Sequence, residues 1–207
     1  MLQTDLVSDS YTLNREHLDI QLHNEFLCQA QANALLDRLI ETVPWQQPRV
    51  KVWGKWHLTP RLVAFYGDTD LHYSYSDTLH GALDWTEELR EIRRQIELYS
   101  SQAFNAVLLN YYRNGQDTIG WHADDEAELG ERPCIASLSL GTARDMHFRP
   151  KSTTCPPLGL NLQHGSLLLM RGETQRHWQH HVPRRSRCTE ARVNLTFRYI
   201  HPQVREG

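Results

Sequence analysis

An alternating segment near the end of the chain constrains the fold more than any other feature. Residues 192–199 read Arg-Val-Asn-Leu-Thr-Phe-Arg-Tyr. Because successive side chains of a β-strand point to opposite faces, this segment predicts a strand with one apolar and one polar face. If the polar face is solvated, the segment is the outside of an antiparallel sheet. If it lines a cavity, its two guanidinium groups and its amide suit a ligand with two carboxylates.

Two helices are predicted before the β-rich half. The first spans about 25–42 and begins after Asn24, a residue type favoured at the N-cap. The second runs from Asp84, its predicted N-cap, to about residue 100, with apolar residues recurring at intervals of three and four. Both helices therefore have one apolar face that must pack against another layer.

The remaining segments read as short strands and connections. Residues 1–23 show no sustained periodicity, so we expect an irregular segment there. Residues 45–82 are rich in Trp, Tyr, Gly and Pro and indicate short strands and loops. From residue 104 onward, short apolar runs are separated by turn sequences such as Asn114-Gly115. This order favours one domain, an antiparallel sandwich or barrel with helices on its outer face.

Composition narrows the class of protein. The 207 residues suit one domain with a substantial core, and the four cysteines lack any CxxC pair, which argues against a zinc ribbon or a disulfide framework. No apolar run approaches a membrane span and no signal peptide is apparent, so we expect no membrane contact and an intracellular protein, cytoplasmic if bacterial and nuclear if eukaryotic.

Charge gives no general case for nucleic-acid binding, because the formal net charge is −3. Such a case rests on local basic clusters, and a basic cluster is more often a solvated loop than a binding surface. The two candidate clusters for phosphate contacts are Arg184, Arg185 and Arg187, and Arg144, Arg149 and Lys151.

A metal motif precedes the alternating strand. His122 and Asp124 lie two residues apart, and the segment 177–181 offers a third ligand. Two histidines and one carboxylate form the facial triad of non-haem Fe(II) oxygenases, although open zinc sites use similar ligands and such histidines can also be hydrogen-bonded within a sheet. A zinc hydrolase does not need the Arg/Asn row. An Fe(II) enzyme that uses 2-oxoglutarate does, because the carboxylate far from the metal needs an arginine.

Together these segments resemble the AlkB family of Fe(II)/2-oxoglutarate dioxygenases over about residues 45–200. The matching motifs are His122-Ala-Asp124, His180, Arg192-Val-Asn-Leu-Thr-Phe-Arg198, Asn110-Tyr-Tyr112, Asp124-Asp125-Glu126 and Ser137-Leu-Ser-Leu-Gly141. Residues 52–57, 66–68 and 73–75 most resemble the branch that repairs duplex DNA.

The resemblance implies an α+β, mainly β fold. It is a double-stranded β-helix, or jelly roll, with N-terminal helices packed on the outside and a nucleotide-recognition lid. Residues 1–207 would form a single dioxygenase domain, with the lid at about 45–82 and the jelly-roll core at about 104–200.

The resemblance also implies roles for individual residues. The expected iron ligands are His122, Asp124 and His180. The distal carboxylate of 2-oxoglutarate would be bound by Arg192, Tyr112 and Asn194, and its chelating end contacted by Arg198 and Asn110, with Thr196 beside them. The residues expected to contact nucleic acid and the flipped base are Trp53, Gly54, Lys55, Tyr73, Ser74 and Tyr75, with Asp125 and Glu126 beside the pocket.

Three tryptophans have different expected positions. Duplex-acting relatives have a smaller aromatic residue at the position of Trp53, so the sequence leaves open whether Trp53 intercalates into a duplex or stacks on a single strand. We expect Trp56 and Trp85 to belong to the core, because aromatic side chains are usually buried.

The implied activity is oxidative demethylation of N-alkylated bases, of the 1-methyladenine and 3-methylcytosine type, with Fe(II), O2 and 2-oxoglutarate. Formaldehyde, succinate and CO2 are released, and the substrate is alkylated DNA, double- or single-stranded, with RNA as a further candidate. We expect a monomer. The alternatives are a 2-oxoglutarate-dependent hydroxylase of a protein or small molecule, which would not need the aromatic and basic region 52–75, and a binding module without turnover.

Overall fold

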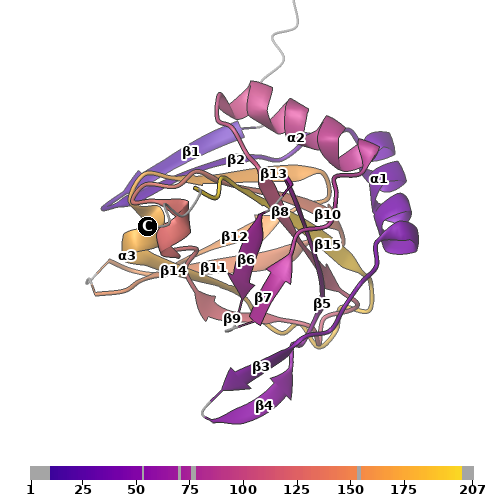
Figure 1. Ribbon diagram of the computed structural model, residues 1–207. Coiled ribbons are helices and arrows are strands. Elements are labelled where there is room, and N and C mark those ends of the chain that lie inside the picture. Colours follow the sequence, from indigo (N-terminus) through magenta and orange to yellow (C-terminus); the bar gives the residue numbers. More distant parts are fainter. Residues whose placement is uncertain (1–9, 53, 70, 76–77, 153–154, 202–207) are drawn as a thin grey trace, which may run out of the picture.

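The computed structural model describes residues 10–52, 54–69, 71–75, 78–152 and 155–201. Its centre is a pair of antiparallel sheets (Figure 1). The large sheet contains, in spatial order, β1 (Ser10–Arg15), β2 (Leu18–His23), β13 (Ser166–Arg171), β10 (Ile135–Gly141), β15 (Arg192–Arg198), β8 (Ala106–Tyr112) and β5 (Leu62–Gly67). The small sheet contains β12 (Leu158–Leu162), β11 (Arg144–Pro150), β14 (Trp178–Val182) and β9 (Ile119–His122).

One core cluster joins the inner faces of the two sheets. Leu108 and Met170 of the large sheet belong to the same buried cluster as Met146, Phe148 and Trp178 of the small sheet. Two facing antiparallel sheets with a shared apolar interior form the predicted jelly-roll sandwich.

Two helices cover the outer face of the large sheet (Figure 1). α1 (Gln29–Thr42) begins after Cys28, and α2 (Glu87–Ser100) begins after Thr86, whose hydroxyl accepts a hydrogen bond from the amide of Leu89 at 3.3 Å. The predicted N-caps Asn24 and Asp84 are therefore wrong, although both helices exist. Asn24 lies four residues before the true cap, Cys28, whose amide is capped by the side chain of Gln31. Asp84 lies two residues before Thr86, and both are cap-forming residue types.

β15 is buried on both faces. Val193, Leu195 and Phe197 pack in the outer cluster beneath the helices. The alternating polar side chains point into the sandwich, where Asn194, Thr196 and Arg198 line a cavity. The polar face of the alternating segment is thus an interior surface, because the small sheet packs over this side of the large sheet.

The N-terminal segment is more ordered than expected. The prediction of an irregular segment over 1–23 is wrong from Ser10 onward, since β1 and β2 form one edge of the large sheet. Leu18, Ile20 and Leu22 are buried and alternate with more exposed residues. This period-two pattern is the signal that identifies the strand.

Two strand pairs lie outside the main sheets. They are β3 (Arg49–Val52) with β4 (Lys55–Leu58), and β6 (His72–Tyr75) with β7 (Thr78–Gly81). Figure 1 shows the β3–β4 pair projecting from one end of the sandwich. Between the two pairs, β5 is a strand of the large sheet, so the interval 45–82 expected to be a lid also contains one core strand.

Two short helical turns complete the described elements: a 3-10 turn, η1 (Ala127–Leu129), and α3 (Thr174–His177), which immediately precedes β14. Across the described residues, the helices are all too short or too polar to cross a lipid bilayer.

Candidate metal and co-substrate site

The structure brings the three predicted metal ligands together. His122 ends β9, Asp124 follows two residues later, and His180 lies on β14 directly opposite His122 in the strand pairing. One ligand atom from each residue lies within 4.8 Å of the others. The β9–β14 pairing sets His122 opposite His180, and the two-residue HxD spacing leaves Asp124 beside them just past the end of β9.

Neighbouring groups orient two of these side chains. Nδ1 of His122 lies 2.8 Å from the carbonyl oxygen of Gly120, which can only accept a hydrogen bond. Nδ1 therefore carries the proton, and Nε2 keeps a lone pair for a metal. The amide of Asp124 donates to Oε1 of Gln175 at 2.9 Å, and its carboxylate forms an ion pair with Arg198. Gln175 was not identified from the sequence.

Electrostatics keep the cluster in its metal-binding form. Burial alone would raise the pKa of Asp124, but Arg198, His180 and His122 together outweigh it and lower that pKa to about 2. Burial, reinforced by His122, lowers the pKa of His180 to about 3. An ionised carboxylate and a neutral imidazole are the forms that bind a divalent cation, and this N2O donor set fits Fe(II).

A buried guanidinium lies near the cluster. Arg192 is 1% exposed, donates one hydrogen bond to the hydroxyl of Ser139 at 3.0 Å, and lies 5.1 Å over the ring of Tyr112. Its Nε and Nη1 have no hydrogen-bond partner in the described part of the chain. Burial lowers the pKa of Arg192. Since buried donors are almost always paired, these two N–H groups fit a carboxylate ligand.

The other predicted co-substrate residues are connected by hydrogen bonds. Nδ2 of Asn194 donates to the hydroxyl of Ser137 at 2.8 Å, and the hydroxyl of Thr196 donates to Oδ1 of Asn194 at 2.9 Å. Oδ1 of Asn110 accepts from Nε of Arg61 at 2.6 Å. Arg61, buried at the start of β5, was missed, because its partner lies 49 residues away and no local pattern marks it.

A cavity between the sheets connects these groups. Its polar lining consists of Asn110, Tyr112, His122, Asp124, Glu126, Ser137, His180, Asn194, Thr196 and Arg198. Apolar side chains such as Met146, Met170 and Val182 complete the wall. The predicted metal ligands and most of the predicted co-substrate residues therefore share one cavity, and Arg192 contacts it through Tyr112.

The two acidic residues expected beside the substrate differ in position. Glu126 lines the cavity. Asp125 is exposed and pairs with Nζ of Lys151 at 2.7 Å, and Lys151 also donates to the carbonyl of Gln175 at 2.9 Å. Glu126 is therefore placed to meet a substrate group inside the cavity, whereas Asp125 faces the outside.

The expected nucleic-acid contacts fall on the two outlying strand pairs. Gly54, with a φ of +77°, and Lys55 are exposed at β4, while Trp53 lies outside the described residues. The backbone of Tyr73, Ser74 and Tyr75 forms β6, and their side chains also lie outside the described features.

Of the two tryptophans expected in the core, one is placed correctly. Trp85 is 8% exposed, as predicted, but Trp56 is 58% exposed, so its assignment to the core is wrong. The reason is that, in the described part of the chain, β4 pairs with β3 in a separate two-stranded sheet outside the two sheets of the sandwich.

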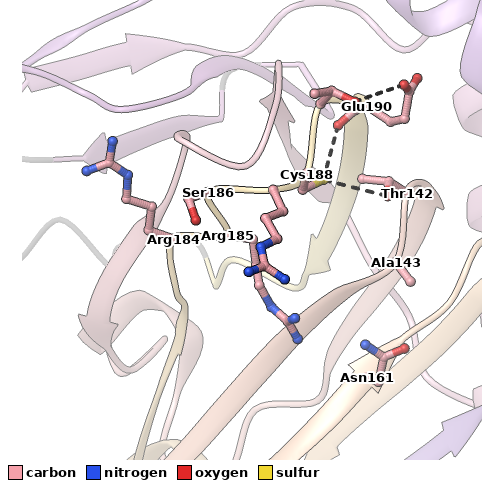
Figure 2. A pocket seen from close by; sticks show the side chains of 10 residues that line it. Thr142, Ala143, Asn161, Arg184, Arg185, Ser186, Cys188 and Glu190 are labelled. Atoms are coloured by element: carbon pink, nitrogen blue, oxygen red, sulfur yellow. Dashed lines mark hydrogen bonds between the residues drawn. The ribbon is translucent and has the colours of Figure 1, made fainter.

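The first basic cluster forms an exposed loop. Arg184, Arg185 and Arg187 line a surface pocket together with Thr142, Asn161, Cys188 and Glu190 (Figure 2). Arg185 forms an ion pair with Asp145. A Cβ atom at Gly115 would collide with the carbonyl of Arg185, so the Asn114-Gly115 turn needs a glycine in order to pack against this loop.

The residues of the second basic cluster do not share one surface. Arg144 is 1% exposed and donates to the carbonyls of Asp117 and Pro183 at 3.0 and 2.6 Å, so its prediction as a phosphate contact is wrong. Arg149 is exposed and lies 4.3 Å over the ring of Trp121. Arg144 and Arg149 are an odd number of positions apart on β11, so their side chains point to opposite faces of the strand.

A jelly-roll sandwich that holds a His-Asp-His cluster and a buried arginine with two donors left for a ligand defines a class, the iron- and 2-oxoglutarate-dependent oxygenases. Residues 19–198 match the family model of the 2OG-Fe(II) oxygenase superfamily. Within that superfamily the chain belongs to the AlkB family. The cofactors are therefore Fe(II), 2-oxoglutarate and O2.

Individual relatives support this membership. The chain is 42% identical over 177 residues to the DNA oxidative demethylase ALKBH2 of Bos taurus, covering 82% of this chain and 64% of that protein. It is 39% identical over 193 residues to the alpha-ketoglutarate-dependent dioxygenase alkB homolog 3 of Homo sapiens, covering 89% and 67%. The chain thus spans about two thirds of the length of these curated relatives.

A solved structure supports the fold. The structure of OsALKBH1 matches with a TM-score of 0.61 at 14% identity and covers 90% of this chain and 98% of that one. At this identity the likeness concerns the fold alone.

Proposed function

We propose that this protein repairs N-methylated bases in DNA, of the 1-methyladenine and 3-methylcytosine type, with RNA as a second possible substrate class. In the proposed reaction an N–CH3 group, O2 and 2-oxoglutarate give N–H, formaldehyde, succinate and CO2. The observation that carries the proposal is one cavity lined by the preoriented His-Asp-His cluster and by Tyr112, behind whose ring Arg192 keeps two buried donors without a partner in the described chain.

Each polar group of the cavity then has a role. His122, Asp124 and His180 hold the iron, which when bound supplies the oxidising chemistry with O2 and 2-oxoglutarate. Arg192, with Tyr112 and Asn194, receives the distal carboxylate of the co-substrate. Asn110 and Thr196 lie on the cavity wall toward its chelating end. Arg198 pairs with Asp124, so we assign to it the orientation of that ligand in addition to a contact with the chelating end.

Recognition of a methylated base follows from the surroundings of the cavity. N-methylation at these positions makes the base cationic, which suits the Glu126 carboxylate in the wall. A base must leave the stack to enter, at a cost of a few kcal/mol that is lower when methylation has already disrupted its pairing. On the β3–β4 pair, the exposed Lys55 is available to a phosphate and the exposed Trp56 to an unstacked base.

The exposed aromatic and basic strand pair favours a nucleic acid over the alternative substrate, a protein or small molecule. Such a hydroxylase would share the metal cluster and the arginine but would gain nothing from Trp56 in solvent. The relatives, a DNA oxidative demethylase among them, point the same way. We also propose that the chain acts as a monomer, which sedimentation velocity would test.

The test is a product assay with matched oligonucleotides. Single- and double-stranded oligonucleotides that carry 1-methyladenine or 3-methylcytosine, and unmodified copies, are incubated with and without Fe(II), and both succinate and formaldehyde are measured. We expect formaldehyde from the methylated copies alone, in equal amount to the additional succinate. His122→Ala should abolish both products, and its fold should persist because the one hydrogen bond of this side chain within the described residues is local, to the Gly120 carbonyl. Succinate without formaldehyde on every oligonucleotide would overturn the proposal.

A further inference from the structure

A second cluster of metal-ligating side chains lies outside the central cavity. It consists of His17 in the turn between β1 and β2, Glu173 immediately before α3, and His177 at the end of α3. One ligand atom from each lies within 4.8 Å of the others. Over the described residues, this cluster and the His122 cluster are the two groups of this kind.

The carboxylate of Glu173 faces both imidazoles. Its Oε2 is 2.8 Å from Nδ1 of His17, and its Oε1 is 4.0 Å from Nε2 of His177. Glu173 and His177 are four residues apart across a helical turn, which places both on one side of it. The rings of His17 and His177 stack, with centroids 4.1 Å apart and an angle of 20° between their planes. Each imidazole has two ring nitrogens, and a neutral ring offers the lone pair of one of them to a metal.

The positions of these residues are set by contacts that do not involve the cluster. Trp178 donates from Nε1 to the carbonyl of Glu16 at 3.0 Å, next to His17. On the other side of the turn, the hydroxyl of Thr174 accepts from the amide of Asp19 at 2.9 Å. His17 itself has a φ of 57°, in the left-handed region that residues other than glycine adopt uncommonly. The turn and α3 therefore hold the ligands in place before any ion binds.

We propose that His17, Glu173 and His177 form a surface site for a divalent cation of the Zn²⁺ type, separate from the iron site. Two imidazoles and one carboxylate suit such an ion, and the remaining positions would be taken by water, because these side chains are 29–41% exposed. The bound ion would connect the β1–β2 turn to α3, whose inward-facing Gln175 accepts the amide of Asp124.

One cationic side chain competes for the same carboxylate. Nη1 of Arg176 lies 4.0 Å from Oε1 of Glu173, and the side chain is 69% exposed. It can therefore move aside when a cation binds. Its removal should leave Zn²⁺ binding unchanged or tighter, whereas removal of a ligand should weaken it. Comparing the removal of Arg176 with the removal of a ligand therefore distinguishes a metal site from a surface ion pair.

The experiment is a Zn²⁺ titration by calorimetry in the His122→Ala chain, in which the iron cluster is disabled. We expect one equivalent of Zn²⁺ to bind and to raise the thermal unfolding midpoint. His17→Ala and Glu173→Gln should each weaken binding by roughly 100-fold or more, since outer-shell partners alone are worth about 10–100-fold. Arg176→Gln and, as a control at an exposed histidine elsewhere, His57→Ala should not weaken it.

Circular dichroism of each metal-free variant checks that the fold is retained. Absence of Zn²⁺ binding in the His122→Ala chain would overturn the proposal. So would equal binding by the His17→Ala, Glu173→Gln and His57→Ala variants.

Discussion

Replacing Arg192 with methionine tests whether its guanidinium is a ligand group or part of the core. Methionine keeps an unbranched side chain in a fully buried position but removes the charge and every donor. Two N–H groups of Arg192 have no partner in the described chain, and a hydrogen bond to a charged group is worth about 1.5–3 kcal/mol. Loss of both should cost about 3–6 kcal/mol of 2-oxoglutarate binding, or roughly 100-fold to 10,000-fold in Kd.

The effect on stability should be small or of the opposite sign. Methionine loses the bond to Ser139, worth about 1 kcal/mol, and the contact with the Tyr112 ring, worth about 0.5–2 kcal/mol. Against this, the variant no longer buries a charge that lacks a carboxylate partner, and replacing buried charges by apolar groups is often neutral or stabilising. The free energy of unfolding without ligand should therefore change by no more than about 2 kcal/mol.

Thermal unfolding measures both quantities at once. With Mn²⁺ in place of iron and 2-oxoglutarate at 100 times the wild-type Kd, the ligand should stabilise the wild type by about 2.7 kcal/mol, a rise in Tm of about 5–10 °C. After a 100-fold loss of affinity the same concentration should stabilise by about 0.4 kcal/mol, a rise of about 1 °C. Arg149→Met, at an exposed position on the small sheet, is the matched control. A variant that keeps the ligand-induced shift but loses several kcal/mol without ligand would refute the assignment.

Three further outcomes are expected. Asp124→Ala and His122→Ala should both abolish formaldehyde release, but only Asp124→Ala should lower the free energy of unfolding, by about 3–5 kcal/mol, because it deprives a buried arginine of its carboxylate; equal urea midpoints would contradict this. Trp56→Ala should weaken binding of a methylated oligonucleotide by about 1–3 kcal/mol, measured by fluorescence anisotropy, without changing the affinity for 2-oxoglutarate. If binding is unchanged, the β3–β4 pair is not a contact surface. Gly115→Ala should lower the Tm because its Cβ would collide with a backbone carbonyl, whereas Gly120→Ala, whose Cβ would meet nothing within 4 Å, should lower it less.

Local patterns predict the strands, both helices and two of the three metal ligands. The strict alternation over 192–198 predicts β15, and the two-residue HxD spacing keeps His122 and Asp124 together at the end of β9. The choice of His180 as the third ligand rests on the resemblance to the AlkB family. The structure confirms the sandwich, both helices and the proximity of His122, Asp124 and His180. The periodicity is written in short stretches of sequence, whereas the pairing of β9 with β14, which sets His180 opposite His122, is not.

The residues that support the site could not be found in this way. Gln175 meets Asp124 across 51 residues, and Arg61 meets Asn110 across 49. Such partners are chosen by the strand order of the two sheets, which no local pattern specifies. Arg144 is a different case, because its odd separation from Arg149 on β11 already implies opposite faces. Arg144 and Arg149 are therefore close in sequence without sharing a surface.

The central position of β15 has a consequence for the dynamics of the enzyme. A strand paired on both edges and buried on both faces loses its amide protection only when the whole sheet opens, so its amides should be among the slowest to exchange with deuterium. The two-stranded β3–β4 and β6–β7 pairs have no such neighbours and should exchange much faster. The groups proposed to bind the co-substrate are thus built into the most persistent part of the molecule. The entry of a substrate would be governed by the β3–β4 and β6–β7 pairs, the least protected part of the molecule.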